Sequence, residues 1–142
     1  MARGRPSGDK TRCSGQWTEA KFRNFIKNNL RAATRKWAPI QNCRKDAHVS
    51  RGLYECALCK EHVPPTIYDE DKKKRVKNLA VDHIKPVIDP EVGFTNWDDV
   101  IESLFCEAEN LRLLCAACHK QVTAEESEVA KQRRAKEKLS EE

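Results

Sequence analysis

Two pairs of cysteines with the same spacing constrain this chain more than any other feature. Cys56 and Cys59 enclose two residues, and so do Cys115 and Cys118. Two residues between cysteines let one tight turn present both sulfurs to a zinc ion, which takes four thiolates in a tetrahedron. The alternatives are redox pairs or chance, but two redox pairs in one small chain without a thioredoxin-like context are not expected. The spacing therefore predicts one structural zinc site.

The stretch between the two pairs is too long for a small zinc finger. Residues 60–114 separate Cys59 from Cys115, which leaves room for an inserted strand, loop, helix and second strand. The chain has 142 residues, a modest apolar fraction and abundant charge, so its hydrophobic core should be small and should gain from a metal staple. We expect an α+β fold in one compact domain with extensions.

Local patterns predict the elements of this domain. Short apolar runs predict strands, and apolar residues at helical spacing predict helices. The expected elements are strands over 53–55, 79–81 and 109–114, a helix over 97–105 capped by Asn96, and a helix from Cys118 toward Lys138. Cys106 is expected in the core, on the apolar face of the helix over 97–105. Residues 128–142 form a charged helical tail that we expect to be exposed and partly disordered.

A helix is also expected near the N-terminus, from Thr18 as its cap to Trp37, with Pro39 ending it. Its apolar residues recur at helical spacing: Phe22, Phe25, Ile26, Leu30, Ala33 and Trp37. Its basic residues occupy other positions and make a candidate nucleic-acid surface: Arg23, Lys27, Arg31, Arg35 and Lys36. The helix can therefore pack inward and still present a basic face. A solvated basic helix without a partner is the alternative.

Charge is distributed unevenly along the chain. Residues 1–50 hold 12 Lys and Arg against 3 Asp and Glu, and residues 51–142 hold 15 against 19, which sums to the net charge of +5. A basic N-terminal third suggests a polyanionic partner, with nucleic acid first. We expect a flexible basic arm over 1–15, a helical nucleic-acid-binding extension over 16–50 and the metal-bound core over 51–127.

Two polar segments carry weaker expectations. Residues 41–52 are expected to hold no more than a short helical turn. Residues 69–77 (DEDKKKRVK) are expected to be a charged loop, in most cases a solvated insertion and less often a phosphate contact.

Asp82-His83, Asn110 and His119 are the candidate chemical residues. Adjacent side chains on a strand point to opposite sides, so Asp82 can bind a hard cation while His83 faces a substrate as a general base. The four thiolates already satisfy zinc, which leaves His119 free for a second ion. Asn110 alone is more often a turn or cap residue. His48 and His62 are expected on the surface, although His62 is close enough to Cys59 to be an alternative zinc ligand.

In this order, these residues resemble the HNH (ββα-metal) nuclease superfamily. Asp82-His83 stands on the first strand, Asn110 nine residues before His119, and His119 opens the helix. With the flanking cysteine pairs (CALC…VDHIKP…NLRLLCAACHKQVT), the chain is similar to the zinc-ribbon members common in bacteriophages and prophages. The resemblance covers residues 16–127, with a specific core over 53–123.

The resemblance implies a ββα-metal fold and hydrolysis of DNA phosphodiester bonds. It implies that His83 is the general base, that Asp82 and His119 bind a catalytic divalent metal, and that Asn110 orients the His83 ring or braces its loop. Nuclease colicins have a further metal-binding histidine where this chain has Thr123. Only two protein ligands would then remain, which favours Mg²⁺ or Mn²⁺ over tightly held zinc.

Partners and location follow as expectations. No apolar run approaches the roughly 20 residues needed to span a bilayer, so we expect no membrane and a cytoplasmic protein, in the host cytoplasm if phage-encoded. Double-stranded DNA is the expected partner, and phage packaging proteins are a second. The rival functions are a non-catalytic zinc-stabilised nucleic-acid-binding module and a packaging accessory protein that is active only when assembled. Monomer and dimer both stay open.

Overall fold

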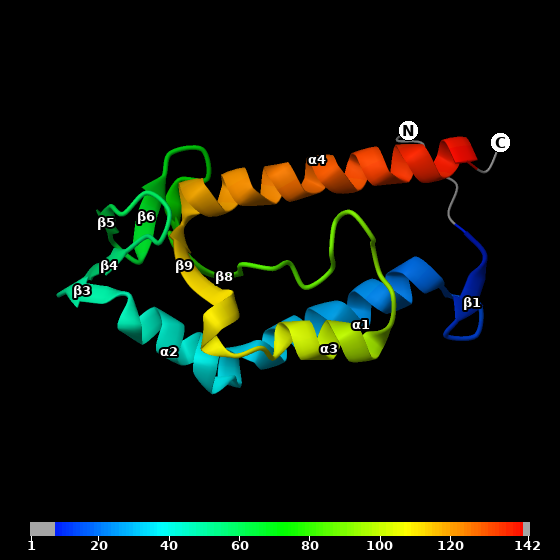
Figure 1. Ribbon diagram of the computed structural model, residues 1–142, viewed down its shortest axis with the longest axis horizontal. Coiled ribbons are helices and arrows are strands. Elements are labelled where there is room, and N and C mark those ends of the chain that lie inside the picture. The colour runs from blue at the N-terminus through cyan, green and yellow to red at the C-terminus, as the bar shows by residue number, and fades with distance from the viewer. Residues whose placement is uncertain (1–7, 141–142) are drawn as a thin grey trace. The chain divides into compact units, whose positions relative to one another are not determined.

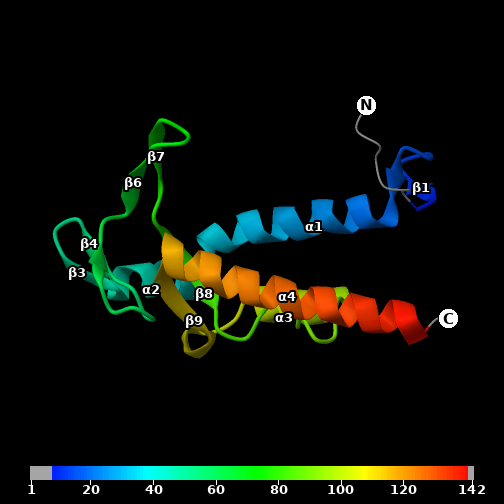
Figure 2. The same ribbon diagram turned by 90° about the horizontal axis from the view of Figure 1, so that it is seen from above.

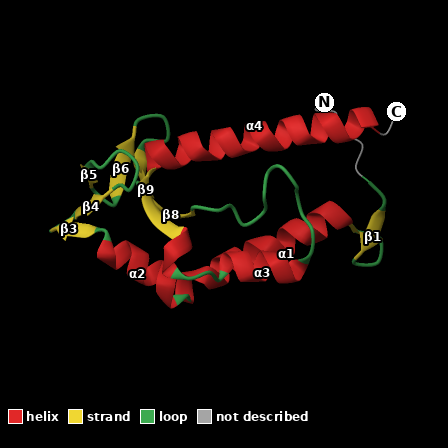
Figure 3. Ribbon diagram, in the orientation of Figure 1, coloured by secondary structure: helices red, strands yellow, loops and turns green. Residues whose placement is uncertain are grey.

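The computed structural model describes residues 8–140, and Figure 3 shows its helices and strands. The fold is α+β, with four α-helices and small antiparallel sheets among the described residues, which confirms the expected class. The chain divides into two compact units, one ending at Arg35 and one beginning at Lys36. In the described part of the chain, no helix is both long and apolar enough to cross a membrane.

The first unit is a short hairpin followed by a helix. Strand β1 (Lys10–Arg12) pairs with β2 (Trp17–Thr18), so part of the predicted arm is a strand, while its residues 1–7 lie outside the described residues. Helix α1 (Glu19–Ala33) begins at the predicted cap, where the Thr18 side chain accepts a hydrogen bond from the Lys21 N–H. The Trp17 ring lies edge-on to Phe25, with centroids 5.2 Å apart.

The predicted single helix up to Trp37 is wrong. Helix α1 ends at Ala33, the 3-10 turn η1 (Thr34–Lys36) follows, and a separate helix α2 (Ala38–Asp46) occupies the segment expected to be mostly irregular. Pro39 lies in the first turn of α2, where its missing N–H needs no partner. The proline therefore begins a helix. The Trp37 indole donates a 2.7 Å hydrogen bond to the Cys106 carbonyl.

Up to Ser140, the strands of the second unit form three small antiparallel sheets (Figure 1). They are β3–β4–β5, β6–β7 and β8–β9, with bounds β3 His48–Ser50, β4 Leu53–Glu55, β5 His62–Val63, β6 Thr66–Asp69, β7 Lys74–Lys77, β8 Leu79–His83 and β9 Leu111–Cys115. The three predicted strands are confirmed as β4, β8 and β9, with small shifts at their ends.

The expected charged loop over 69–77 is instead part of the β6–β7 hairpin. Asp69 closes its turn, because one carboxylate oxygen accepts hydrogen bonds from the Asp71 and Lys72 N–H groups. Lys73 takes a positive φ of 53° in the same turn. Turn formation by an Asx side chain is a recognised hairpin device, and here it allows a strongly charged segment to form a strand.

Two helices and a 3-10 turn complete the second unit. Helix α3 (Trp97–Leu104) begins at the predicted Asn96 cap, η2 covers Ala108–Asn110, and α4 covers Ala116–Ser140. Cys106 lies beyond the end of α3 and is half-buried, so its expected place on the helix is wrong. The last ten residues of α4 are mostly exposed, as expected of the tail. The expected partial disorder is wrong up to Ser140, because the helix is continuous to that residue.

The core is small and centres on β9. Leu111, Leu113 and Leu114 are at most 8% exposed, and Leu114 packs with Cys56 and Cys115. Val100 and Leu104 of α3 are also buried. Strand β9 contacts β8 and the helices α2 and α4, and the cysteine turns lie at its C-terminal end.

Arg133 joins the loop after β8 to α4. Its Nη1 donates a 3.3 Å hydrogen bond to the Pro90 carbonyl, and its Nε lies 3.3 Å from Glu137 Oε1. Gly93, with a φ of +85°, faces the same guanidinium, and a Cβ on Gly93 would lie 2.5 Å from Arg133 Nη1. Figure 1 shows this loop bending toward α4. The absence of a side chain at Gly93 permits the contact.

We predict that Gly93→Ala destabilises the protein by roughly 1–3 kcal/mol, from positive-φ strain and displacement of Arg133. Gly52→Ala is the matched control, because Gly52 also has a positive φ, of +72°, and a Cβ added there would meet no atom within 4 Å. Denaturant unfolding should show a larger loss of unfolding free energy for Gly93→Ala than for Gly52→Ala. Equal losses would mean that the Arg133 contact adds nothing to the stability of the protein.

Candidate metal centre and the adjoining hairpin

The sulfurs of Cys56, Cys59, Cys115 and Cys118 lie within 4.8 Å of one another and can hold a metal ion. Four thiol ligands with this spacing suit zinc. Cys56 is fully buried and Cys115 nearly so, whereas Cys59 is exposed. His62 lies on β5, with its ring 3.7 Å from a Glu55 carboxylate oxygen, and it is not part of the four-sulfur group.

The first cysteine pair sits on a tight turn. The Lys60 N–H donates to the Cys56 carbonyl at 3.0 Å, and the Cys56 N–H donates to the Glu61 carbonyl at 3.0 Å. Lys60 has a φ of 64°, which reverses the chain after Cys59. The turn brings both sulfurs of the pair to one side.

The second pair is tied to the first through β9. The Ala57 N–H donates to the Leu113 carbonyl at 2.8 Å, and the Cys115 N–H donates to the Cys56 sulfur at 3.4 Å. Backbone contacts therefore hold the two turns together in addition to any metal. Because α4 starts at Ala116, the same contacts fix the direction in which this helix leaves.

Asn78 is a buried link that the sequence patterns did not indicate. It is only 7% exposed. Its side-chain amide donates to the Pro64 carbonyl at 3.0 Å, and its backbone carbonyl accepts from the Ala116 N–H at 3.0 Å. It thereby joins the start of α4 to the chain before β6. The sequence offered no distinct signal, because Asn78 directly follows the basic run that ends at Lys77.

The four sulfurs differ in their affinity for protons. Burial raises the pKa of Cys56, but three backbone N–H groups, led by that of Cys115, lower it more, to about 6. The pKa of Cys118 is raised to about 12, first by its hydrogen bond with the Cys115 sulfur and then by burial. The pKa of Cys59 is also raised: the Glu61 N–H and the Cys118 sulfur lower it, but burial and the Cys56 and Cys115 sulfurs outweigh them. Without a metal ion, the Cys59 and Cys118 sulfurs are therefore protonated near neutral pH.

Asp82 and His83 occupy opposite faces of the β8–β9 hairpin. Asp82 pairs with Arg112 across the strands, and its Oδ2 accepts from Arg112 Nε at 3.0 Å, with both side chains largely buried. His83 pairs with Leu111, and its Nε2 lies 3.0 Å from the Leu104 carbonyl at the end of α3. The alternation expected at these two residues is thus present. The Arg112 partner was not foreseen.

The Leu104 contact determines which His83 nitrogen carries the proton. A carbonyl oxygen can only accept, so Nε2 must donate. In the neutral ring, Nδ1 is then the unprotonated nitrogen, with its lone pair available. This is the tautomer that a proton acceptor acting through Nδ1 requires.

Asn110 braces the chain directly after His83. Its Oδ1 accepts from the Lys85 N–H at 2.8 Å and its Nδ2 donates to the Lys85 carbonyl at 3.3 Å, while its own carbonyl accepts from the Ile84 N–H at 2.8 Å. Of the two roles expected of Asn110, these contacts match the bracing of the loop.

His119 lines a cavity of about 640 Å³ where α4 meets the hairpin strands. The other lining residues are Lys77, Leu79, Ala80, Ala116, Lys120, Thr123 and Ala124. Asp82 is two residues beyond Ala80 on β8 and therefore points to the same side of the strand. Leu79, on the opposite side of the strand, lines the same cavity, and neither Asp82 nor His83 lines it.

The basic residues of α1 gather at four-residue intervals. Arg23 and Arg31 are exposed. Burial and then the charges of Arg31 and Arg23 lower the pKa of Lys27. Arg23, Lys27 and Arg31 therefore lie along one side of the helix, where the two arginine charges disfavour the charged form of Lys27. Arg35 and Lys36, also expected in this surface, are exposed and follow the end of α1.

Comparisons of the chain with models of protein families, with curated proteins and with solved structures find no match.

We predict that zinc binding releases at least two protons near neutral pH, one each from Cys59 and Cys118, whose raised pKa values keep them protonated without metal. Affinity should fall as pH falls, because protons compete for the sulfurs. Calorimetry in two buffers of different ionisation enthalpy measures the release.

Cys115→Ser should lose zinc and unfold the core. Cys43→Ser is the control, because Cys43 lies outside the cluster, and it should keep both the zinc and the fold. A folded Cys115→Ser protein without zinc would contradict the structural role.

Asn110→Ala should destabilise the protein by roughly 1–3 kcal/mol, since it removes two hydrogen bonds to Lys85. Hydrogen exchange should quicken at the Lys85 amide. Asn110→Asp retains an acceptor for that amide, so its exchange should stay slower than in Asn110→Ala. Unchanged exchange at Lys85 in Asn110→Ala would show that the brace is unimportant.

Proposed function

We propose that this protein is an endonuclease that hydrolyses DNA phosphodiester bonds at a ββα-metal site formed by β8, β9 and the first turns of α4. The observation that carries the proposal is the His83–Leu104 hydrogen bond of 3.0 Å. It presents Nδ1 as a fixed proton acceptor on a half-buried ring. A structural histidine needs no free nitrogen, whereas a general base does.

The donor set around the hairpin supports a hard divalent cation, Mg²⁺ or Mn²⁺. In this proposal Asp82 contributes a carboxylate and His119 an imidazole, and water and phosphate oxygens complete such a shell. Arg112 holds one carboxylate oxygen of Asp82, which leaves the other for the ion. When bound, the ion supplies Lewis-acid stabilisation of the charge on the phosphoryl and leaving oxygens.

The residues of the chain divide the remaining work. His83 Nδ1 takes a proton from a water molecule, whose oxygen attacks phosphorus in line as the bond to the 3′-oxygen breaks. The departing 3′-oxygen takes a proton from solvent water, so the products carry a 5′-phosphate and a 3′-hydroxyl. Asn110 holds the backbone at Lys85, and so keeps the His83 ring in place. The Leu104 carbonyl stabilises the imidazolium that forms.

The basic residues Arg23, Lys27 and Arg31 bind the DNA backbone in this proposal. Burial and then the charges of Arg31 and Arg23 lower the pKa of Lys27, and bound phosphates would offset the effect of the two arginines. This surface by itself fits a non-catalytic binding module equally well, so catalysis has to be measured directly.

We predict that purified protein nicks or linearises supercoiled plasmid when Mg²⁺ or Mn²⁺ is added, and that His83→Gln lowers the rate by at least about 10²–10⁴-fold, as expected for loss of a general base. The glutamine amide can still donate to the Leu104 carbonyl, so folding should be retained. His48→Gln is the matched control, because His48 is exposed on β3.

Three results would be decisive. Wild-type cleavage that persists in His48→Gln and vanishes in His83→Gln supports the proposal. Cleavage by His83→Gln at the wild-type rate rules out His83 as the base. DNA binding without cleavage by any of the proteins favours the binding module.

A further inference from the structure

The β6–β7 hairpin has two chemically different faces. Directly paired residues are Thr66 with Lys77 and Tyr68 with Arg75. Paired residues, and residues two apart on a strand, share a face. These four therefore form one face, called here the Tyr68 face. Ile67, Val76, Asp69 and Lys74 form the other, the Ile67 face.

The Tyr68 face is basic and aromatic, without an acidic residue. Tyr68 is 51% exposed. Arg75 is held flat across the strands, because its Nε donates to the Thr66 hydroxyl at 3.1 Å and its Nη2 to the Thr66 carbonyl at 2.9 Å. The arginine is thus positioned in advance, and the tyrosine ring beside it is open. On the Ile67 face, Asp69 stands opposite Lys74 and offsets its charge.

The Tyr68 face leads to the cavity that His119 lines. Lys77, at the end of the face, lines the cavity together with Lys120 of α4. Within residues 8–140, neither lysine forms an ion pair. Two uncompensated ammonium groups beside His119 suit phosphate oxygens.

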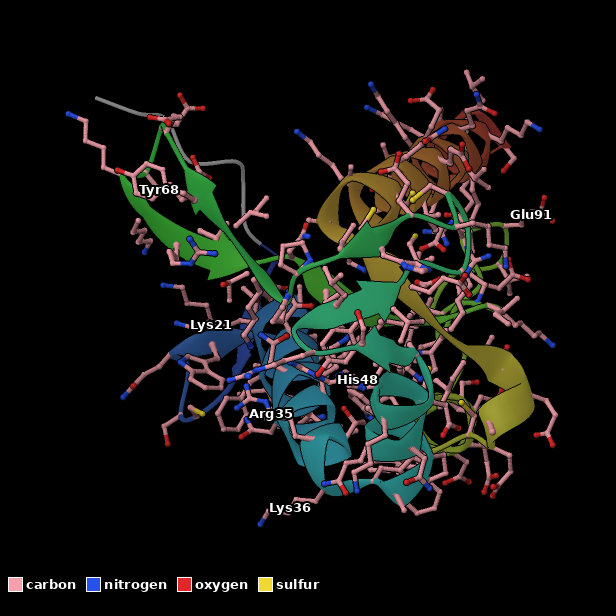
Figure 4. All side chains as sticks on the ribbon, turned by 90° about the vertical axis from the view of Figure 1, so that its left-hand side faces the viewer. Lys21, Arg35, Lys36, His48, Tyr68 and Glu91 are labelled. Carbon is pink, nitrogen blue, oxygen red and sulfur yellow. The ribbon has the colours of Figure 1, made fainter. Side chains whose placement is uncertain are left out.

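The hairpin stands clear of the other strands of its unit. Figure 2 shows β6 and β7 projecting from the part of the unit that holds β8 and β9, and Figure 4 shows Tyr68 on this projecting ribbon. A two-stranded ribbon of this kind has both of its faces available to a large ligand, and the major groove of DNA is wide enough to admit one.

We propose that the Tyr68 face is a DNA-binding arm that holds the duplex beside the scissile bond. Lys77 and Lys120 contact the phosphates nearest the cavity, Arg75 contacts a phosphate further along, and the Tyr68 ring packs against the sugar–base edge. This inference rests on the proposed nuclease function for the identity of the ligand, and it deepens that function by naming the surface that positions the substrate.

The test compares two double variants. Each variant removes one lysine charge and one large side chain. Tyr68→Ala with Lys77→Gln alters the Tyr68 face, and Ile67→Ala with Lys74→Gln alters the Ile67 face. Both are made on the His83→Gln background, and binding to a fluorescent duplex is measured at several salt concentrations without added Mg²⁺. Circular dichroism and zinc content check that both proteins are folded.

The Tyr68-face variant should bind at least about tenfold more weakly, and the slope of log affinity against log salt should fall by about 0.9, the loss of one phosphate contact. The Ile67-face variant should stay close to the parent protein in both measures. Equal losses in the two variants, or none in either, would overturn the inference. Tighter binding of duplex RNA than of DNA, with the same face dependence, would also overturn it.

Failure of the proposed function gives a different pattern. If the protein with His83 intact binds duplex DNA through the Tyr68 face but never cleaves it, the nuclease proposal fails and the arm stands. If it cleaves DNA and the two double variants bind alike, the arm fails and the nuclease stands. If it neither binds nor cleaves, both fail.

Discussion

The four-sulfur cluster is the constraint on which the rest of the second unit depends. It joins two segments that are far apart in the sequence, the turn after β4 and the junction of β9 with α4. Few of the described residues are buried elsewhere, so the hydrophobic core supplies little free energy, and metal binding is expected to supply much of the rest. Asn110 precedes β9 and His119 follows it, so the candidate site inherits its position from this junction.

Strand register then assigns each candidate residue its direction. Because Asp82 lies opposite Arg112 and His83 opposite Leu111, the carboxylate points to one side of the hairpin and the imidazole to the other. A shift of one residue would exchange them. Such a shift would also break the Asp82–Arg112 ion pair and the His83–Leu104 hydrogen bond. These two contacts therefore oppose the shift and maintain the geometry of the polar site.

Contacts made by backbone groups complete the site and could not be read from residue types. The Leu104 carbonyl sets the tautomer of His83, and the backbone of Lys85 receives the Asn110 side chain. The same applies to the charged run over 69–77. Its composition is typical of a solvated loop, but cross-strand pairing with Thr66 and Ile67 makes it a strand, since β structure depends more on partners than on intrinsic preference.

The sequence alone determined the elements whose signals are local. The cysteine spacing predicted the cluster, side-chain caps predicted the starts of α1 and α3, and apolar runs predicted β8 and β9. Only the tertiary structure decided that Trp37 and Pro39 open a second helix, that Arg112 pairs with Asp82, and that the Tyr68 face leads to the His119 cavity. Caps and turns involve residues close in the chain, whereas these other contacts join distant segments, and their partners are known only once the chain has folded.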